Sequence, residues 1–89
     1  MSAEYKVAFT GNAAKELRKL DRASQKRIAA AVRGLAQEPR PSGVTKLTGY
    51  AHTHRIRVGD FRVIYDVFDD TLLIEIIRVR DRKDAYKGI

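Results

Sequence analysis

The run "RIRVGDFRVIYDVF" at residues 55–68 constrains the fold of this chain most strongly. Apolar residues alternate on both sides of Gly59-Asp60, which is the pattern of two antiparallel strands joined by a two-residue turn. Counting outward from this turn places Arg57 directly opposite Arg62. Like charges in that position repel each other. Folding alone therefore does not explain why the hairpin has two arginines opposite each other.

The same count assigns the side chains to two faces of the hairpin, and a slip of one residue would exchange these faces. One face is apolar and suits a cover of helices, so Tyr65 is expected in the core. It carries Ile56, Val63, Tyr65 and Val67. The other face carries Arg55, Arg57 and Arg62, together with Ile64, and is expected to be open to water or to a negatively charged partner.

The rest of the chain predicts one strand and two helices before the hairpin, and one strand after it. The expected strands are 5–9, 53–58, 61–68 and 72–79, with Asp69-Asp70 in the second turn. The expected helices are 13–20, capped by Thr10 or Asn12, and 25–38, capped by Asp21 or Ser24. These elements predict a compact α+β fold of order β-α-α-β-β-β, as a single domain over residues 1–89. Its twisted antiparallel sheet would carry the two N-terminal helices on one face.

The chain is strongly basic, with a formal net charge of +7 and a pI near 10.1. Through Thr53 there are ten Lys or Arg against four Asp or Glu, whereas from His54 onward there are eight against seven. A basic excess indicates a polyanionic partner, either nucleic acid or an acidic protein. A solvated lysine-rich surface is also a sufficient explanation of the charge in the first half.

Several classes of protein are disfavoured by what the sequence lacks. It has no cysteine, which excludes disulfides and thiol chemistry. His52 and His54 have no third His or Cys to complete a metal site, so no metal is expected. No window is apolar enough to span a bilayer and no signal peptide is evident, so a cytoplasmic protein without a membrane partner is expected.

A second group of cations follows the last predicted strand, in "RVRDRKDAY". It brings Arg78, Arg80, Arg82 and Tyr86 towards the arginines of the hairpin. Arginine makes bidentate contacts with phosphate, and tyrosine can stack on a base or exchange a proton. This combination favours a phosphodiester site. The alternative is that the arginines are ordinary solvent-facing residues, partly paired with Glu75, Asp60 or Asp66.

The order "LTGYAHTHRIRVGDFRVIYDVFDD…LIEIIRVRDRKDAY", behind a helical pair containing "AAKELRKL", resembles the RelE/ParE superfamily of bacterial and archaeal toxins, and most closely its RelE branch. The resemblance runs from Tyr5 to Tyr86. It implies a toxin of a type II toxin-antitoxin system. RelE-type members are endoribonucleases that cleave mRNA in the ribosomal A site, which inhibits translation.

The resemblance also implies roles for individual residues. Arg55 and Arg57 would hold the RNA backbone and lower the effective pKa of Tyr86. Tyr86 would help to remove the 2′-hydroxyl proton, and Arg62 would stabilise the charge of the phosphorane. Arg82 would assist the leaving oxygen. On this model the catalytic residues are Arg57, Arg62, Arg82 and Tyr86, the RNA-binding residues are Arg55, Arg57, Arg80 and Lys83, and neither a metal nor another cofactor takes part.

Two other functions remain open for a chain of this kind. ParE-type relatives inhibit DNA gyrase by binding it and are not nucleases, and they are expected to lack a complete arginine–tyrosine set. A catalytically inert homologue would act only through antitoxin binding. For each function the expected partner is a cognate antitoxin, RelB-like or of another family. The nuclease would in addition meet the ribosome and mRNA, and a toxin–antitoxin heterotetramer could bind operator DNA through the antitoxin.

Overall fold

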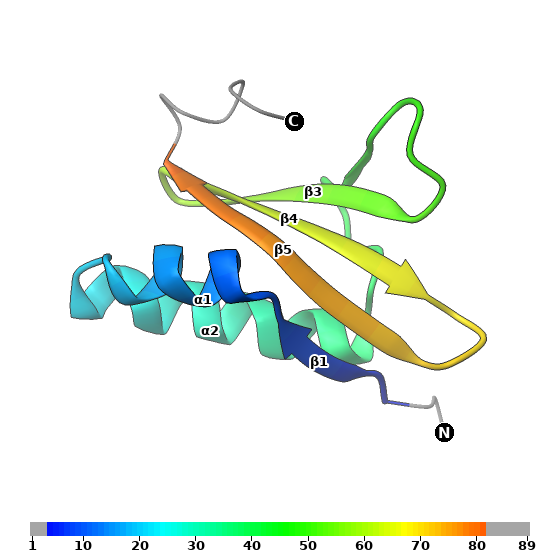
Figure 1. Ribbon diagram of the computed structural model, residues 1–89, viewed down its shortest axis with the longest axis horizontal. Coiled ribbons are helices and arrows are strands. Elements are labelled where there is room, and N and C mark those ends of the chain that lie inside the picture. The colour runs from blue at the N-terminus through cyan, green and yellow to red at the C-terminus, as the bar shows by residue number, and fades with distance from the viewer. Residues whose placement is uncertain (1–3, 82–89) are drawn as a thin grey trace.

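The computed structural model describes residues 4–81, and these form two helices and a five-stranded sheet (Figure 1). The elements are β1 (Lys6–Phe9), α1 (Gly11–Arg18), α2 (Arg22–Gln37), β2 (Thr45–Lys46), β3 (Thr53–Val58), β4 (Phe61–Phe68) and β5 (Leu73–Asp81). The predicted α+β class and element order are confirmed, and the bounds of β3 and β4 agree with those predicted. The two-residue strand β2 lies between the predicted helix 25–38 and the predicted strand 53–58, where no helix or strand was predicted.

The sheet has the strand order β1-β5-β4-β3-β2, with β2 to β5 joined in antiparallel pairs. β1 pairs with β5 in parallel, with Lys6 opposite Leu73 and Phe9 opposite Ile76. The sheet is therefore mixed, and the prediction of an antiparallel sheet was wrong at this edge. Two helices and a meander separate β1 from β5, so no hairpin turn imposes an antiparallel pairing on them.

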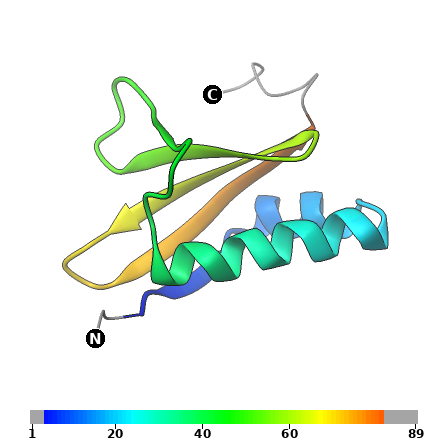
Figure 2. The ribbon, with the colours of Figure 1, turned by 180° about the vertical axis from the view of Figure 1, so that it is seen from behind.

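Both helices cover the same face of the sheet, as Figure 1 and Figure 2 show from opposite sides. Thr10 caps α1, because its Oγ1 accepts a hydrogen bond of 3.2 Å from the Ala13 amide. Asp21 is the N-cap of α2, which begins earlier than predicted, and α2 ends before Pro39. Between helices and sheet lies a core that includes Ile28, Val32, Leu35, Ile56, Val63, Tyr65, Val67, Ile74, Ile76 and Val79.

Tyr65 lies in this core as predicted, with none of its surface exposed. Its hydroxyl donates a hydrogen bond of 2.7 Å to the Pro39 carbonyl, so its one polar group is satisfied. Burial raises the pKa of Tyr65 to about 12, and the side chain therefore stays neutral and structural.

The two turns of the meander differ. Gly59 has φ +60° between β3 and β4, while Asp60 keeps a negative φ, which is the pattern of a two-residue type II′ turn. Between β4 and β5, Phe68 pairs with Leu73, so the turn extends from Asp69 through Leu72. Leu72 has φ 52° and lies in this turn. The predicted start of the last strand at Leu72 was one residue early.

Candidate functional site

The pairing of β3 with β4 confirms the predicted hairpin register, with Arg57 opposite Arg62 and Ile56 opposite Val63. β5 extends the same line of residues, because Arg80 lies opposite Arg62. Arg57, Arg62 and Arg80 thus occupy neighbouring positions on three adjacent strands, and we call them the arginine row. Directly opposed residues have Cβ atoms about 5 Å apart. The arginine row therefore places three arginines at neighbouring positions at one end of the sheet.

A β-bulge in β5 brings Arg80 into this row. Ile64 pairs with Arg78, but the next residue, Tyr65, pairs with Ile76, which leaves Ile77 as an extra residue. Side chains alternate strictly along a regular strand, so Ile76 in the core would otherwise put Arg78 and Arg80 on the helix side. The extra residue reverses this phase and puts both arginines on the opposite face. The doublet of apolar residues in "EIIRVR" is the sequence signal that could have revealed the bulge.

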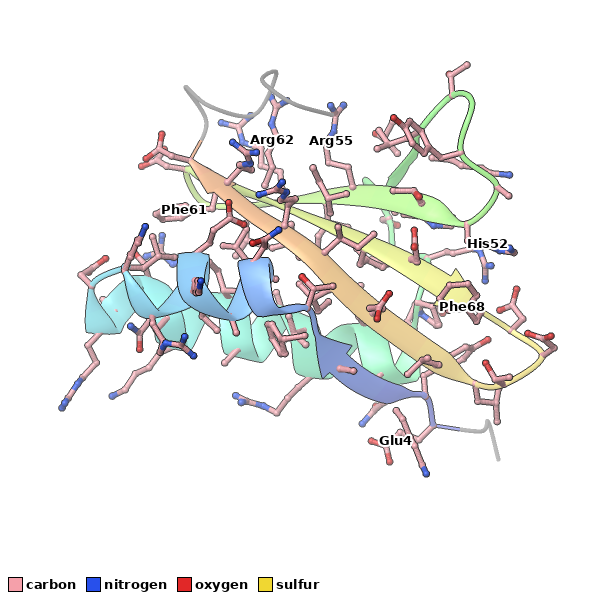
Figure 3. All side chains as sticks on the ribbon, viewed as in Figure 1. Glu4, His52, Arg55, Phe61, Arg62 and Phe68 are labelled. Carbon is pink, nitrogen blue, oxygen red and sulfur yellow. The ribbon has the colours of Figure 1, made fainter. Side chains whose placement is uncertain are left out.

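The arginine side of the sheet lies opposite the helices. Figure 3 shows Arg55 and Arg62 pointing away from α1 and α2, whereas Phe61 points towards them. Arg57 is exposed, and Arg55 and Arg62 are half-buried. Ile64, which lies between Arg55 and Arg78 in the adjacent row, is only 1% exposed. The prediction that this whole face is open to water was therefore wrong at Ile64.

An acidic residue that the sequence reasoning missed faces the last two arginines of β5. Glu16 of α1 accepts a 2.9 Å hydrogen bond from the Val79 amide through Oε1. Its Oε2 lies 3.4 Å from Arg78 Nη1 and 3.5 Å from Arg80 Nε. No periodicity could have revealed this contact, because more than 60 residues separate the partners.

Of the acids predicted to pair with the arginines, Asp66 has a different partner. It accepts a hydrogen bond of 2.5 Å from the Thr53 hydroxyl. Glu75 lies opposite Asp66, towards the other end of the sheet. Arg57 donates from its Nε to the Gly59 carbonyl over 3.3 Å, which holds the arginine against its own turn.

The structure thus brings together part of the predicted site. Arg57, Arg62 and Arg80 form the arginine row, and Arg55 lies in the next row. The remaining predicted residues, Arg82, Lys83 and Tyr86, lie outside the described residues. Their assignment stays a prediction.

The two histidines have separate surroundings. His54 is 5% exposed, stacks on Tyr65 with ring centroids 5.7 Å apart, and has its pKa lowered mainly by burial. His52 is exposed beside Phe68, with ring centroids 5.0 Å apart.

Within residues 4–81 no three His, Cys, Asp or Glu side chains gather as metal ligands would. In that same part of the chain, neither helix has the length and apolarity to cross a bilayer.

Comparison with known proteins identifies relatives along almost the whole chain. A family model described as the ParE toxin of a type II toxin-antitoxin system, parDE, matches residues 7–86. A RelE-like toxin protein of Escherichia coli is 37% identical over 92% of this chain and 90% of its own length.

Solved structures show the same fold. The archaeal RelE–RelB complex from Pyrococcus horikoshii OT3 matches with a TM-score of 0.81 and 32% identity, over 92% of this chain and 99% of the other. The intact RelBE toxin–antitoxin complex of E. coli matches with a TM-score of 0.77 and 25% identity, over 86% of this chain and 95% of the other. The chain belongs to the RelE/ParE superfamily of type II toxin-antitoxin toxins, in its RelE branch.

Proposed function

We propose that this toxin is a ribosome-dependent endoribonuclease that cleaves mRNA in the A site without a metal ion. The observation that carries the proposal is the arginine row. Arg57, Arg62 and Arg80 extend across three strands on the face opposite the helices, and they form a concentrated cationic surface for a phosphate. Arginine donates two parallel hydrogen bonds to phosphate oxygens, which fixes both position and orientation.

The proposed reaction is transfer of the phosphodiester to the adjacent 2′-hydroxyl. A bond forms between the 2′-oxygen and phosphorus, and the bond from phosphorus to the 5′-oxygen breaks. The products are a 2′,3′-cyclic phosphate and a 5′-hydroxyl. Negative charge develops on the nonbridging oxygens in the transition state, and preorganised cations there supply about 3 kcal/mol for each donor. In this scheme Arg62 stabilises that charge, Tyr86 helps to remove the 2′-hydroxyl proton, and Arg82 assists the leaving oxygen.

This function also explains why the hairpin keeps Arg57 opposite Arg62. The two side chains repel each other in the free protein, and a phosphate bound between them would convert the repulsion into attraction. Arg55 and Lys83 would hold the RNA backbone on either side of the scissile phosphate. Substrate binding therefore compensates for an unfavourable feature of the unliganded sheet.

We further propose a cognate antitoxin as the protein partner. The relatives from P. horikoshii and E. coli were each solved in complex with a RelB antitoxin. The excess of positive charge before residue 54 suits an acidic partner segment that orders on binding.

The runner-up function is inhibition of DNA gyrase by binding, because the family model that matches the chain describes a ParE toxin. The two functions differ in the residues that they require. A nuclease needs its cations at a phosphate, whereas an inhibitor that only binds a protein has no use for Tyr86 as a proton acceptor.

Ribosomes programmed with a defined message, with cleavage mapped by primer extension, test the proposal. A-site cuts are expected for the wild type on programmed ribosomes and should be absent on naked RNA. Arg62→Ala and Tyr86→Phe should each reduce the cleavage rate by at least about 100-fold. Absence of cleavage by well-folded wild-type protein would refute the nuclease. Gyrase supercoiling assays would then separate the ParE-like function from an inert homologue.

A further inference from the structure

The carboxylate of Glu16 lies between α1 and the outer edge of β5, where β1 has ended. β1 pairs with β5 only as far as Ile76, so the following residues of β5 have no strand on that side within the described chain. The start of α1 takes the place of β1 there. Thr10 donates from its backbone amide to the Ile76 carbonyl over 2.9 Å and from its hydroxyl to the Ile77 carbonyl over 3.1 Å.

These contacts give Glu16 a fixed orientation. One oxygen, Oε1, is held by the Val79 amide at 2.9 Å. The other oxygen, Oε2, then faces Arg78 and Arg80, which flank Val79 on β5. The three charged side chains are 19–29% exposed, so their attraction is less screened than that of a surface pair. A carboxylate anchored to the backbone is a rigid electrostatic support for both arginines.

Glu16 approaches Arg80 at Nε of the guanidinium group, as an ion pair over 3.5 Å and not as a hydrogen bond. The Nη atoms are then the groups that Arg80 can direct towards a phosphate beside Arg62, its neighbour on β4. Without the carboxylate, Arg80 would lose its counter-charge at the edge of β5 and would no longer be held in one orientation between Arg62 and Arg78. The position of Glu16 thus influences the orientation of the Arg80 guanidinium group.

We infer that Glu16 is a positioning residue for the RNA phosphate site, which it serves by holding the Arg80 guanidinium in the arginine row. The inference rests on the proposed function for its substrate. Glu16 touches no substrate in this scheme and acts only through Arg80. Because its own charge is negative, it lowers the general attraction of the site for RNA while improving the geometry of one contact.

Glu16→Gln tests this role because the amide oxygen can still accept from the Val79 amide while the negative charge is lost. Glu75→Gln is the matched control, since it makes the same change in net charge on β5, the strand that carries Arg80. Single-turnover cleavage on programmed ribosomes compares five variants. These are Glu16→Gln, Glu75→Gln, Arg80→Ala, and the two double variants that combine Arg80→Ala with each glutamine change. The rate at saturation and the toxin concentration at half-saturation are measured separately, and thermal unfolding monitors the fold.

Glu16→Gln is expected to lower the rate at saturation about tenfold, with an unchanged or lower half-saturation concentration. Glu75→Gln should leave the rate at saturation as in the wild type. On the Arg80→Ala background, Glu16→Gln should cost no further rate, because its effect passes through Arg80. Equal rates for the two glutamine variants, or a full additional loss in the Glu16→Gln/Arg80→Ala double variant, would overturn the inference.

Equilibrium binding separates this result from failure of the proposed function. Affinity for a short RNA with 2′-deoxy substitution is measured for the same variants by fluorescence anisotropy. If the wild type does not cleave, the proposed function fails, but the role of Glu16 is still decided. Binding that differs between Glu16→Gln and Glu75→Gln, with the difference lost on the Arg80→Ala background, supports positioning. Identical binding of the two variants refutes it.

Discussion

Arg40 and Asp69 form a bidentate ion pair, with Nη2 2.8 Å from Oδ2 and Nη1 3.2 Å from Oδ1. The Tyr5 hydroxyl donates a further hydrogen bond of 2.6 Å to the same carboxylate. The three residues join the segment after α2, the β4–β5 turn and the residue before β1. The pair lowers the pKa of Asp69 to about 2, chiefly through the hydrogen bond from Arg40 and then through that from Tyr5.

This lowered pKa predicts a pH dependence of stability. The folded-state pKa lies below the ordinary value of 3.8, so the stabilising effect of Asp69 is present above about pH 4 and is lost as the pH falls towards 2. Asp69→Asn should therefore flatten the fall in the free energy of unfolding across that range. Urea unfolding at a series of pH values measures it, with Asp70→Asn, the adjacent acid of the turn, as the control. An unchanged pH slope in Asp69→Asn would contradict the prediction.

Gly59→Ala should destabilise the protein by about 1–3 kcal/mol because the turn requires a positive φ. The new Cβ would also lie 2.7 Å from Nη1 of Arg27, although that flexible side chain can move. Gly34→Ala, within α2 and with open space at its Cβ, should instead stabilise by about 0.5–1 kcal/mol. Chemical unfolding of the two variants compares them, and equal effects would show that the turn imposes no special conformation.

Thr10→Ala should destabilise the protein by about 1–2 kcal/mol, because it removes the cap of α1 and the hydrogen bond to the Ile77 carbonyl. Thr10→Ser keeps the hydroxyl and should retain most of the stability. Chemical unfolding of both variants measures the difference. A similar loss in the serine variant would mean that the methyl group, and not the hydrogen bonds, stabilises this junction.

Arg57→Gln should raise the free energy of unfolding by about 0.2–1 kcal/mol at low salt, because it relieves repulsion from Arg62. The same change should reduce RNA cleavage, since it removes a cation of the arginine row. Added salt should stabilise the wild type more than the variant, because it screens the repulsion. Unfolding at two salt concentrations tests this, and Arg33→Gln on the exposed surface of α2 is the control. A variant less stable than the wild type at low salt would exclude repulsion as a cost.

The hairpin was predictable because its information is local. Gly59-Asp60 and the alternation around it determine which residue faces which, and the structure has Arg57 opposite Arg62. The core position of Tyr65 follows from the same count. Two features were not predictable in this way. The parallel pairing of β1 depends on the path of the whole chain, and Glu16 meets Arg78 and Arg80 only after α1 has packed on β5.

The β-bulge at Ile77 was only partly predictable from the sequence. Ile76 and Ile77 are adjacent apolar residues, whereas strict alternation would place a polar residue next to an apolar one. Such a doublet is also compatible with a regular strand that is buried on both faces. Only the pairing of Tyr65 with Ile76 identifies Ile77 as the extra residue.

Ile77 also divides β5 into two parts with different neighbours. Residues before it pair with β1 and fill the core, so their variation is limited by folding. Within the described chain, residues after it pair with β4 alone, meet Glu16 of α1 at their outer edge, and carry Arg78 and Arg80 on the face opposite the helices. Val79 still belongs to the core. Substitutions of Arg78 and Arg80 would therefore change the charge of the face opposite the helices while the β1–β5 pairing is retained.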